Sequence, residues 1–203
     1  MNRTILPLCM AALLVGCLFS APVQQHYFMI HYLPLVKPAK ITYPYTVRVQ
    51  DLKLDEAYKR PQLAYRFNPY EIKYYGYQLW GVRPDKSITD LLVNHLGQRS
   101  VFQEVLKEYA DKRPDFEISG NLLSLEEFDN GQERYAHLAL RFRLTRHQDR
   151  KVLLTHHFDG RQMVYQQETT FLVKTLSEML EKQIDEFIIK IEEFLAREAG
   201  DAH

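Results

Sequence analysis

The strictest pattern in the chain is an alternation of apolar and polar residues between Tyr135 and Thr145. Successive side chains of a strand point to opposite faces, so the pattern predicts a β-strand with one apolar and one polar face. The apolar face comprises Ala136, Leu138, Leu140, Phe142 and Leu144, and the polar face comprises Tyr135, His137, Ala139, Arg141 and Arg143. A fold that contains such a strand has to cover one face of a sheet and leave the other in water.

A long amphipathic segment near the C-terminus can provide that cover. From about Thr169 to Arg197, apolar residues recur at steps of three and four, with charged residues between them. The spacing predicts one helix with a single apolar stripe, which we expect to pack on the sheet rather than form a coiled coil or lie on a membrane. The stripe consists of Val173, Leu176, Leu180, Ile184, Phe187, Ile191 and Phe194.

Other segments rich in β-branched, aromatic or alternating residues predict further strands. We expect strands or extended backbone over 26–32, 45–50, 62–67, 71–75, 77–80, 116–122, 152–158 and 161–166. Turn residues separate several of them, at Asn68–Pro69, Asn130–Gly131 and Asp159–Gly160.

Two shorter helices are predicted between the strands. Ser87 is expected to cap a helix that ends near Gly97, and Ser100 to cap a second short helix over 101–106. The order of elements then predicts an α+β fold. It is a two-layer sandwich of a mostly antiparallel sheet, with the helices, one of them long and C-terminal, on one face.

Composition narrows the possible partners. The chain has 203 residues, 46% of them hydrophobic, which fits a globular domain and is too apolar for disorder. The 26 basic and 26 acidic residues give a formal net charge of +0. Because no overall field attracts phosphates, we expect no nucleic-acid partner.

The first residues predict a lipoprotein signal. Asn2 and Arg3 precede the apolar run Ile5–Val15, which is too short to span a hydrocarbon layer of about 30 Å. The tetrapeptide Leu14-Val15-Gly16-Cys17, which overlaps the end of this run, resembles the bacterial lipobox. That motif implies a diacylglyceryl group on the Cys17 thiol, cleavage before Cys17 and N-acylation of the new terminus. An ordinary signal peptide with a chance cysteine, or a buried apolar helix, is the alternative.

This signal sets the expected domain organisation. We expect a signal peptide over 1–16, a lipidated tether over 17–25, one domain over 26–198 and a tail over 199–203. The two cysteines are Cys9 and Cys17, so the domain after cleavage has no internal disulfide. Leu18, rather than Asp, after the cysteine favours sorting to the outer membrane of a Gram-negative bacterium, facing the periplasm.

Signatures of catalysis or metal binding are missing from the sequence. His156 and His157 are adjacent, so on a strand they point to opposite faces and do not readily share one metal ion. Neither a G-x-S-x-G motif nor a phosphate-binding glycine loop occurs. The carboxylate pairs Glu126–Glu127 and Glu192–Glu193 are expected on solvated surfaces. We therefore predict a non-enzymatic protein with no metal and no cofactor apart from the lipid on Cys17.

Aromatic and basic residues form the candidate interaction sites. Residues 63–92 are dense in aromatics, and if their strands alternate, some of these rings face outward or meet a partner. The candidate structural or interface aromatics are Tyr65, Tyr74, Tyr75 and Trp80. Arg141 and Arg143, with Arg146, make a basic stripe that we expect to pair with acidic neighbours or to stay solvated.

Several of these features together resemble the ABC-type transport auxiliary lipoproteins, which include a paraquat-inducible lipoprotein that accompanies a membrane-spanning MCE protein. The lipobox and the aromatic first strand carry the resemblance, together with the segments 47–49, 63–66, 71–75, 78–80, 88–96 and 101–105. The resemblance implies an accessory protein of an MCE or ABC system that moves lipids between membranes. It also implies fold or interface roles for Tyr74, Tyr75 and Trp80.

Two other functions stay open on the sequence. The chain can be a structural lipoprotein of a secretion or envelope-assembly complex, where homo-oligomers are expected. It can also bind or hydrolyse lipid alone.

Overall fold

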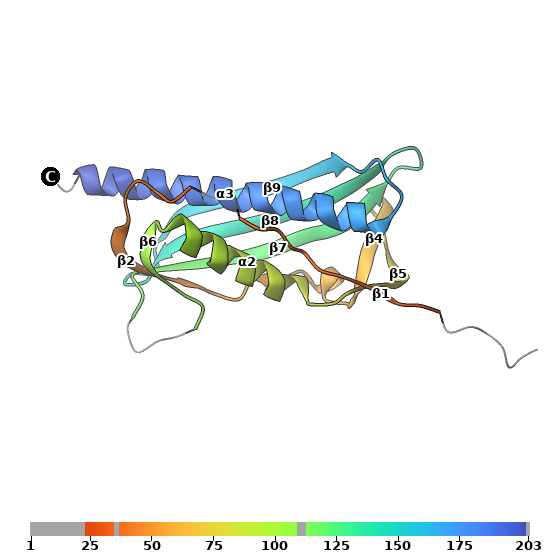
Figure 1. Cartoon of the computed structure of the whole chain (residues 1–203), viewed down its shortest axis with the longest axis horizontal. Helices are drawn as coiled ribbons and strands as arrows, with labels where there is room; N and C mark the ends of the chain where they lie inside the picture. Colours follow the sequence, from red (N-terminus) through yellow and green to blue (C-terminus); the bar gives the residue numbers. More distant parts are fainter. Residues whose placement is uncertain (1–22, 35–36, 109–112, 202–203) are drawn as a thin grey trace, which may run out of the picture.

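A nine-stranded mixed sheet with two α-helices on one of its faces forms the domain (Figure 1). The computed structural model describes residues 23–34, 37–108 and 113–201. The strands are β1 (His26–Phe28), β2 (Tyr43–Val49), β3 (Lys53–Leu54), β4 (Gln62–Asn68), β5 (Glu71–Trp80), β6 (Phe102–Leu106), β7 (Phe116–Asp129), β8 (Arg134–Arg146) and β9 (Val152–Met163). The helices are α2 (Pro84–Arg99) and α3 (Thr169–Asp201), with a 3₁₀ turn, η1 (Glu56–Tyr58), before β4. The predicted α+β class and the long C-terminal helix are confirmed.

Strand β7 organises the sheet. Along one side it pairs antiparallel with β8, which pairs antiparallel with β9. Along its other side, β2, β3 and β4 pair with it in succession, all parallel. Strand β6 extends the sheet beyond β2, while β5 and then β1 extend it beyond β4. The longest pairings are antiparallel, and the parallel ones belong mainly to the short N-terminal strands.

The hairpin between β7 and β8 forms at the predicted turn. Gly131 has a φ of 88°, a left-handed conformation that glycine adopts without a Cβ clash. The Asp129 carboxylate accepts the Gly131 N–H at 2.6 Å, and the Asn130 side chain accepts the Glu133 N–H at 2.8 Å. These local bonds explain why so short a signal predicted the hairpin that joins two long strands.

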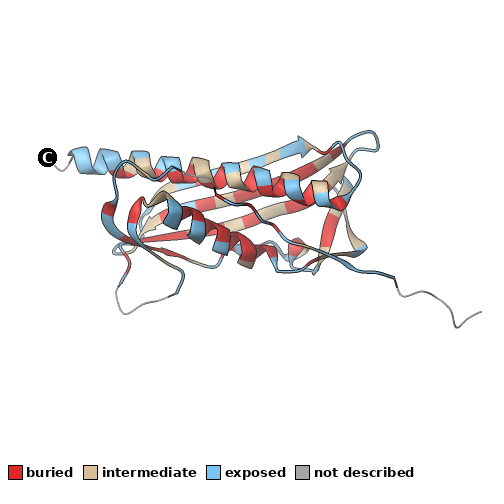
Figure 2. Ribbon diagram, viewed as in Figure 1, coloured by how far each residue is buried: buried red, intermediate tan, exposed pale blue. Residues whose placement is uncertain are grey.

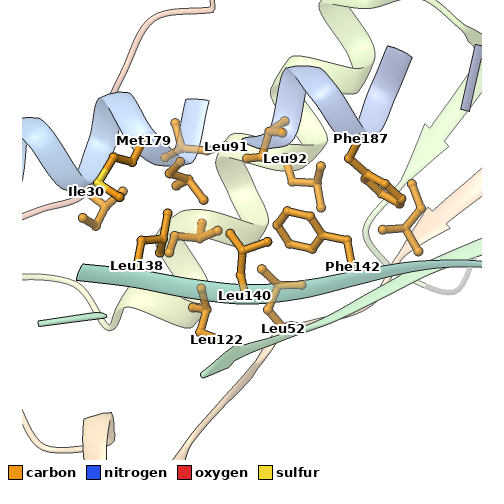
Figure 3. Packing of buried hydrophobic residues seen from close by; sticks show 14 of the residues in the cluster. Ile30, Leu52, Leu91, Leu92, Leu122, Leu138, Leu140, Phe142, Met179 and Phe187 are labelled. Atoms are coloured by element: carbon orange, nitrogen blue, oxygen red, sulfur yellow. The ribbon is translucent and has the colours of Figure 1, made fainter. Parts of the chain in front are cut away.

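The alternation on β8 produces the expected division between two faces. Leu138, Leu140 and Phe142 are fully buried and point toward the helices (Figure 3). The Phe142 ring lies 5.4 Å from the Phe187 ring of α3. A Cβ on Gly120 of β7 would lie 2.7 Å from Phe142, so the absence of a side chain there makes room for that ring.

A strap that follows β1 closes the helical layer. Residues 29–34 run between α2 and α3 (Figure 1), and Ile30 and Tyr32 are buried along it. The His31 N–H donates to Ser177 of α3 at 3.2 Å, and the Tyr32 hydroxyl lies 3.2 Å from His95 Nδ1 of α2. Both helices turn their buried stripe toward the sheet (Figure 2). The predicted strand over 26–32 therefore ends at Phe28.

The predicted start of α2 is wrong. The helix begins at Pro84 with Arg83 as the N-cap, and the Ser87 hydroxyl donates to the Pro84 carbonyl within the first turn. Proline suits the first helical position because its φ is already helical and its missing N–H has no partner there. Asp85 adds the negative charge that a helix N-terminus favours.

The second predicted short helix, over 101–106, is also wrong. Ser100 has a φ of 55° and ends α2 instead of capping a new helix. Residues 102–106 form β6, which pairs parallel with β2. Apolar residues in so short a segment fit either structure, and here the pairing with β2 decides.

The predicted turn at Asp159–Gly160 is wrong as well, because β9 runs through it to Met163. Asp159 is held by His137 of the neighbouring strand at 2.9 Å. A Cβ on Gly160 would lie 2.5 Å from the Phe158 ring, so this glycine serves packing within the strand.

Candidate interaction surfaces

Trp80 belongs to the core. It is 8% exposed at the end of β5, and its backbone N–H donates to the Pro61 carbonyl at 2.7 Å. Phe28 of β1 pairs with it in register. These contacts link three segments at one edge of the sheet, so Trp80 acts in packing.

Tyr65 and Tyr75 form a half-buried pair on β4 and β5. Their ring centroids lie 4.8 Å apart, and Phe67 lies 5.5 Å from Tyr65. Burial, followed by the negative charge of Glu127, raises the pKa of Tyr75 well above its usual value. Glu127 itself forms an ion pair of 2.5 Å with Arg134. The Tyr65–Tyr75 pair therefore lies beside the Glu127 carboxylate, whose charge Arg134 compensates.

Tyr74 points to the other side of β5. Its hydroxyl donates to the Ala57 carbonyl of η1 at 2.8 Å, and the Arg60 guanidinium lies 4.6 Å from its ring centroid. The four aromatic candidates thus do not form one surface.

The most exposed aromatics are different residues. Tyr70 is 95% exposed at the tip of the β4–β5 hairpin, Tyr165 after β9 is 81% exposed, and Tyr27, Tyr77 and Phe67 are about half exposed or more. The Asn68–Pro69 turn is a signal that places Tyr70 at a tip. For Tyr77, alternation along β5 does not predict the exposed side. Gln62 pairs with Leu79 and Ala64 pairs with Tyr74, so β4 advances by two residues where β5 advances by five. Such a bulge changes which residues share a face.

The face of the sheet away from the helices carries a buried ionic network around Glu126. This carboxylate accepts hydrogen bonds of 2.7 Å from both the Tyr58 hydroxyl and Arg66 Nε. His137 Nδ1 lies 3.0 Å from it, and the other ring nitrogen lies 2.9 Å from Asp159. Glu126 is 3% exposed. The expectation that Glu126 and Glu127 are solvated is therefore wrong, because partners on neighbouring strands compensate their burial.

The network shifts the protonation of its members. Burial lowers the pKa of His137, but the hydrogen bonds and negative charges of Glu126 and Asp159 outweigh it and raise the pKa. Burial raises the pKa of Glu126, but the bonds from His137, Tyr58 and Arg66 outweigh it and lower the pKa. Burial raises the pKa of Tyr58 to about 12. Both nitrogens of His137 contact carboxylates, so the ring has no free nitrogen with which to take a substrate proton.

A second carboxylate on this face, Glu117, is held in the same way. Arg48 donates to it at 2.9 Å, Arg150 at 3.2 Å, and His147 Nδ1 lies 3.3 Å away. Glu117 is 3% exposed. Each buried carboxylate of this face is thus matched by cations from neighbouring segments.

Between the two networks lie cations without such partners. Arg141 and Arg143 have no hydrogen bond or ion pair within the described residues, unlike Arg146, which lies 3.3 Å from Asp149. Lys53 is also exposed and unpaired within that part of the chain. We call Lys53, Arg141 and Arg143 the basic patch.

The histidines expected to point apart do so. His156 is buried against α3, with Nε2 2.9 Å from Gln183 and Nδ1 2.9 Å from Lys190, while His157 is exposed on the opposite face. Burial lowers the pKa of His156. Over the described residues, no three His, Cys, Asp or Glu side chains gather in a metal-binding arrangement.

Neither described helix combines the length and the apolar run that crossing a membrane requires. Cys17 lies outside the described residues, and its predicted lipidation stays a prediction.

Solved structures with low sequence identity share this fold. Protein XCC0632 from Xanthomonas campestris, of the DUF330 family, is 14% identical over 86% of this chain and 99% of its own, with a TM-score of 0.75. An uncharacterized protein is 10% identical over 83% and 99%, with a TM-score of 0.67. The protein CT253 from Chlamydia trachomatis is 8% identical over 75% and 98%, with a TM-score of 0.50.

Comparison with curated proteins found no relative. A family model described as the ABC-type transport auxiliary lipoprotein component matches residues 33–186, which include α2, every strand after β1 and the N-terminal part of α3. The chain belongs to the family of ABC-type transport auxiliary lipoprotein components.

Proposed function

We propose that this chain is an outer-membrane lipoprotein that serves an ABC-type system carrying lipids between membranes, with an MCE-domain protein as its partner. The observation that carries the proposal is the family match over residues 33–186. Membership supports a transport-associated accessory role in the cell envelope. The lipobox at 14–17 and Leu18 support the outer-membrane anchor.

The chemistry of the domain fits an accessory role. The sequence has no phosphate-binding glycine loop, so ATP hydrolysis falls to a separate subunit. The side chains that approach a catalytic arrangement, Glu126, His137 and Asp159, are already bonded to one another. What the domain offers is surface for partners.

The shape suits a tethered module. An extended chain spans at most about 3.6 Å per residue, so a lipid on Cys17 would hold Val23 within roughly 20 Å of the membrane. The C-terminal end of α3 lies at the opposite end of the molecule from β1 (Figure 1). A helix of 33 residues is about 50 Å long, so that end would reach well into the periplasm.

Replacing the lipidated thiol tests the anchor. In cells labelled with radioactive palmitate, Cys17→Ala is expected to lose the label and leave the outer-membrane fraction. Cys9→Ala is the matched control, because Cys9 lies in the leader and its loss should change neither result. Label retained by Cys17→Ala would refute the lipoprotein assignment.

The partner is tested by purification and by gene neighbourhood. The lipidated chain is expected to co-purify with the MCE-domain protein encoded beside it, next to a permease and an ATPase. Neighbouring secretion genes, and co-purification with their products instead, would replace the transport role with envelope assembly.

A further inference from the structure

We propose that the open face of the sheet is a docking surface on which the basic patch (Lys53, Arg141 and Arg143) binds an acidic segment of a partner protein. The assignment stands on this surface alone and holds whether or not Cys17 is lipidated. Three observations support this assignment: the register that brings the cations together, their lack of partners within the described residues, and the polarity of the side chains opposite them.

Register brings the three cations together. Lys53 of β3 pairs with Asn121 of β7, which pairs with Arg141 of β8. Neighbouring strands are about 4.8 Å apart, so the Lys53 and Arg141 backbones are separated by roughly 10 Å. Arg143 lies two residues along β8, on the same face at roughly 7 Å. His157 of β9 pairs with Arg141 and adds a ring beside it.

The carboxylates of this face do not neutralise the patch. Glu117 is engaged by Arg48 and Arg150, and Glu126 by Arg66. Asp159, the remaining acid of β9, is bonded to His137. Asp55 and Glu56, which follow Lys53 in the chain, are bonded to the Ala57 N–H and to Lys59. The patch therefore has no acidic partner within the described residues, while the protein as a whole has a formal charge of +0.

Arginine chemistry favours carboxylates as the complement. The guanidinium presents a planar fork of donors that matches a carboxylate through two parallel hydrogen bonds. Cross-strand neighbours supply further hydrogen-bonding groups, with Ser119 opposite Arg143 on β7 and Thr155 opposite it on β9.

A lipid surface fits this face less well than an acidic protein segment. Surfaces that bind bilayers combine basic residues with apolar side chains that insert between the lipids. The cross-strand neighbours of Arg141 and Arg143 are Ser119, Asn121, Thr155 and His157, all polar. Of the exposed aromatics, Tyr27, Phe67, Tyr70 and Tyr77 lie on or beside β1, β4 and β5, and Tyr165 follows the C-terminal end of β9.

The test compares binding of a defined acidic probe to three forms of the purified full chain in detergent. The probe is a fluorescein-labelled peptide of alternating Glu and Ser, followed by fluorescence anisotropy at low ionic strength. The patch variant is Arg141→Ser with Arg143→Ser. The control variant is Lys182→Ser with Arg197→Ser, which removes the same charge from exposed positions of α3.

The patch variant is expected to bind the peptide about tenfold more weakly, which corresponds to about 1.4 kcal/mol. The control should bind like the unchanged chain, and added salt should weaken peptide binding by both of these forms more than binding by the patch variant, because exposed charges are screened. Equal affinity of the patch variant, or equal weakening of both variants, would overturn the docking surface.

A competitor separates proteins from lipids as the source of the negative charge. Dihexanoyl phosphatidylglycerol below its micelle concentration carries an anionic phosphate without forming a bilayer. It is expected to displace the labelled peptide poorly, whereas the unlabelled peptide displaces it fully. Displacement by the lipid at the same concentration as by the peptide would overturn the protein partner in favour of a phosphate headgroup.

Discussion

The two faces of β8 meet different surroundings although their side chains come from adjacent residues. Phe142 is fully buried beneath α3, whereas Arg141 and Arg143 on either side of it point away from the helices. Burial of apolar area stabilises the fold by about 25 cal/mol per Å², and that contribution belongs to the covered face. The open face holds its buried carboxylates in ionic networks and leaves Lys53, Arg141 and Arg143 unpaired within the described residues. The covered face thus specifies the fold, and the open face is the one that we propose for docking.

Removing Phe142 should have the largest effect. Phe142→Ala leaves a cavity beside Phe187 and is expected to lower the free energy of unfolding by about 3–5 kcal/mol. Urea denaturation measures the loss, with Arg143→Ala, the next residue, as the control that should change stability by no more than about 0.5 kcal/mol. Similar losses for the two variants would remove the distinction between the faces.

The ionic network of the open face should matter less than the core. Glu126→Gln keeps the shape but removes the charge that Arg66, Tyr58 and His137 contact, and we expect a loss of about 2–3 kcal/mol. Thermal and urea unfolding measure this loss of stability, and Glu193→Gln, at an exposed position of α3, is the control. A loss below about 0.5 kcal/mol would mean that the network is a consequence of the fold rather than a support of it.

The pH dependence of stability separates the histidines of the two faces. The pKa of His137 is raised in the folded state, so its contribution is full below its unfolded value of 6.5 and is lost as pH rises through the folded value. The pKa of Glu126 is lowered, so its contribution is present above 4.5 and is lost as pH falls through the folded value. The network therefore contributes most between about pH 4.5 and 6.5.

The variant His137→Gln tests the direction of this pH dependence. The stability difference between the unchanged chain and the variant should be largest in that window and shrink above it. His156 on the covered face has a lowered pKa, so the corresponding difference for His156→Gln should grow as pH rises through 6.5. Stability differences that change with pH in the same direction for both variants would contradict the assignment of the two environments.

The smallest expected effect is on the basic patch. Arg141→Ser with Arg143→Ser should change the free energy of unfolding by no more than about 0.5 kcal/mol, because neither side chain has a partner in the described part of the chain. Urea midpoints measured beside the peptide titrations check it. A loss above about 1 kcal/mol would give the patch a structural role.

Periodicity was a reliable guide wherever one face is covered by a single layer. The pattern of β8, the turn at Asn130–Gly131 and the stripe of α3 each predicted their element, because each depends on residues close in sequence. Periodicity failed at 101–106, where pairing with β2 outweighs the local preference. The turn signal failed at Asp159–Gly160, where β9 continues and Gly160 makes room for the Phe158 ring.

The sequence by itself determined the long helix and the division of β8 into two faces, because these follow from patterns within single segments. It also determined the α+β class, through the order of the elements, and the family, through a resemblance spread over most of the chain. Only the tertiary structure decided that Trp80 is buried, that Glu126 and Glu127 are compensated inside the protein, and that Lys53 joins Arg141 and Arg143. The physical reason is shared by all three: register between strands far apart in the chain sets which side chains meet, and the bulge in β5 changes that register without a local signal.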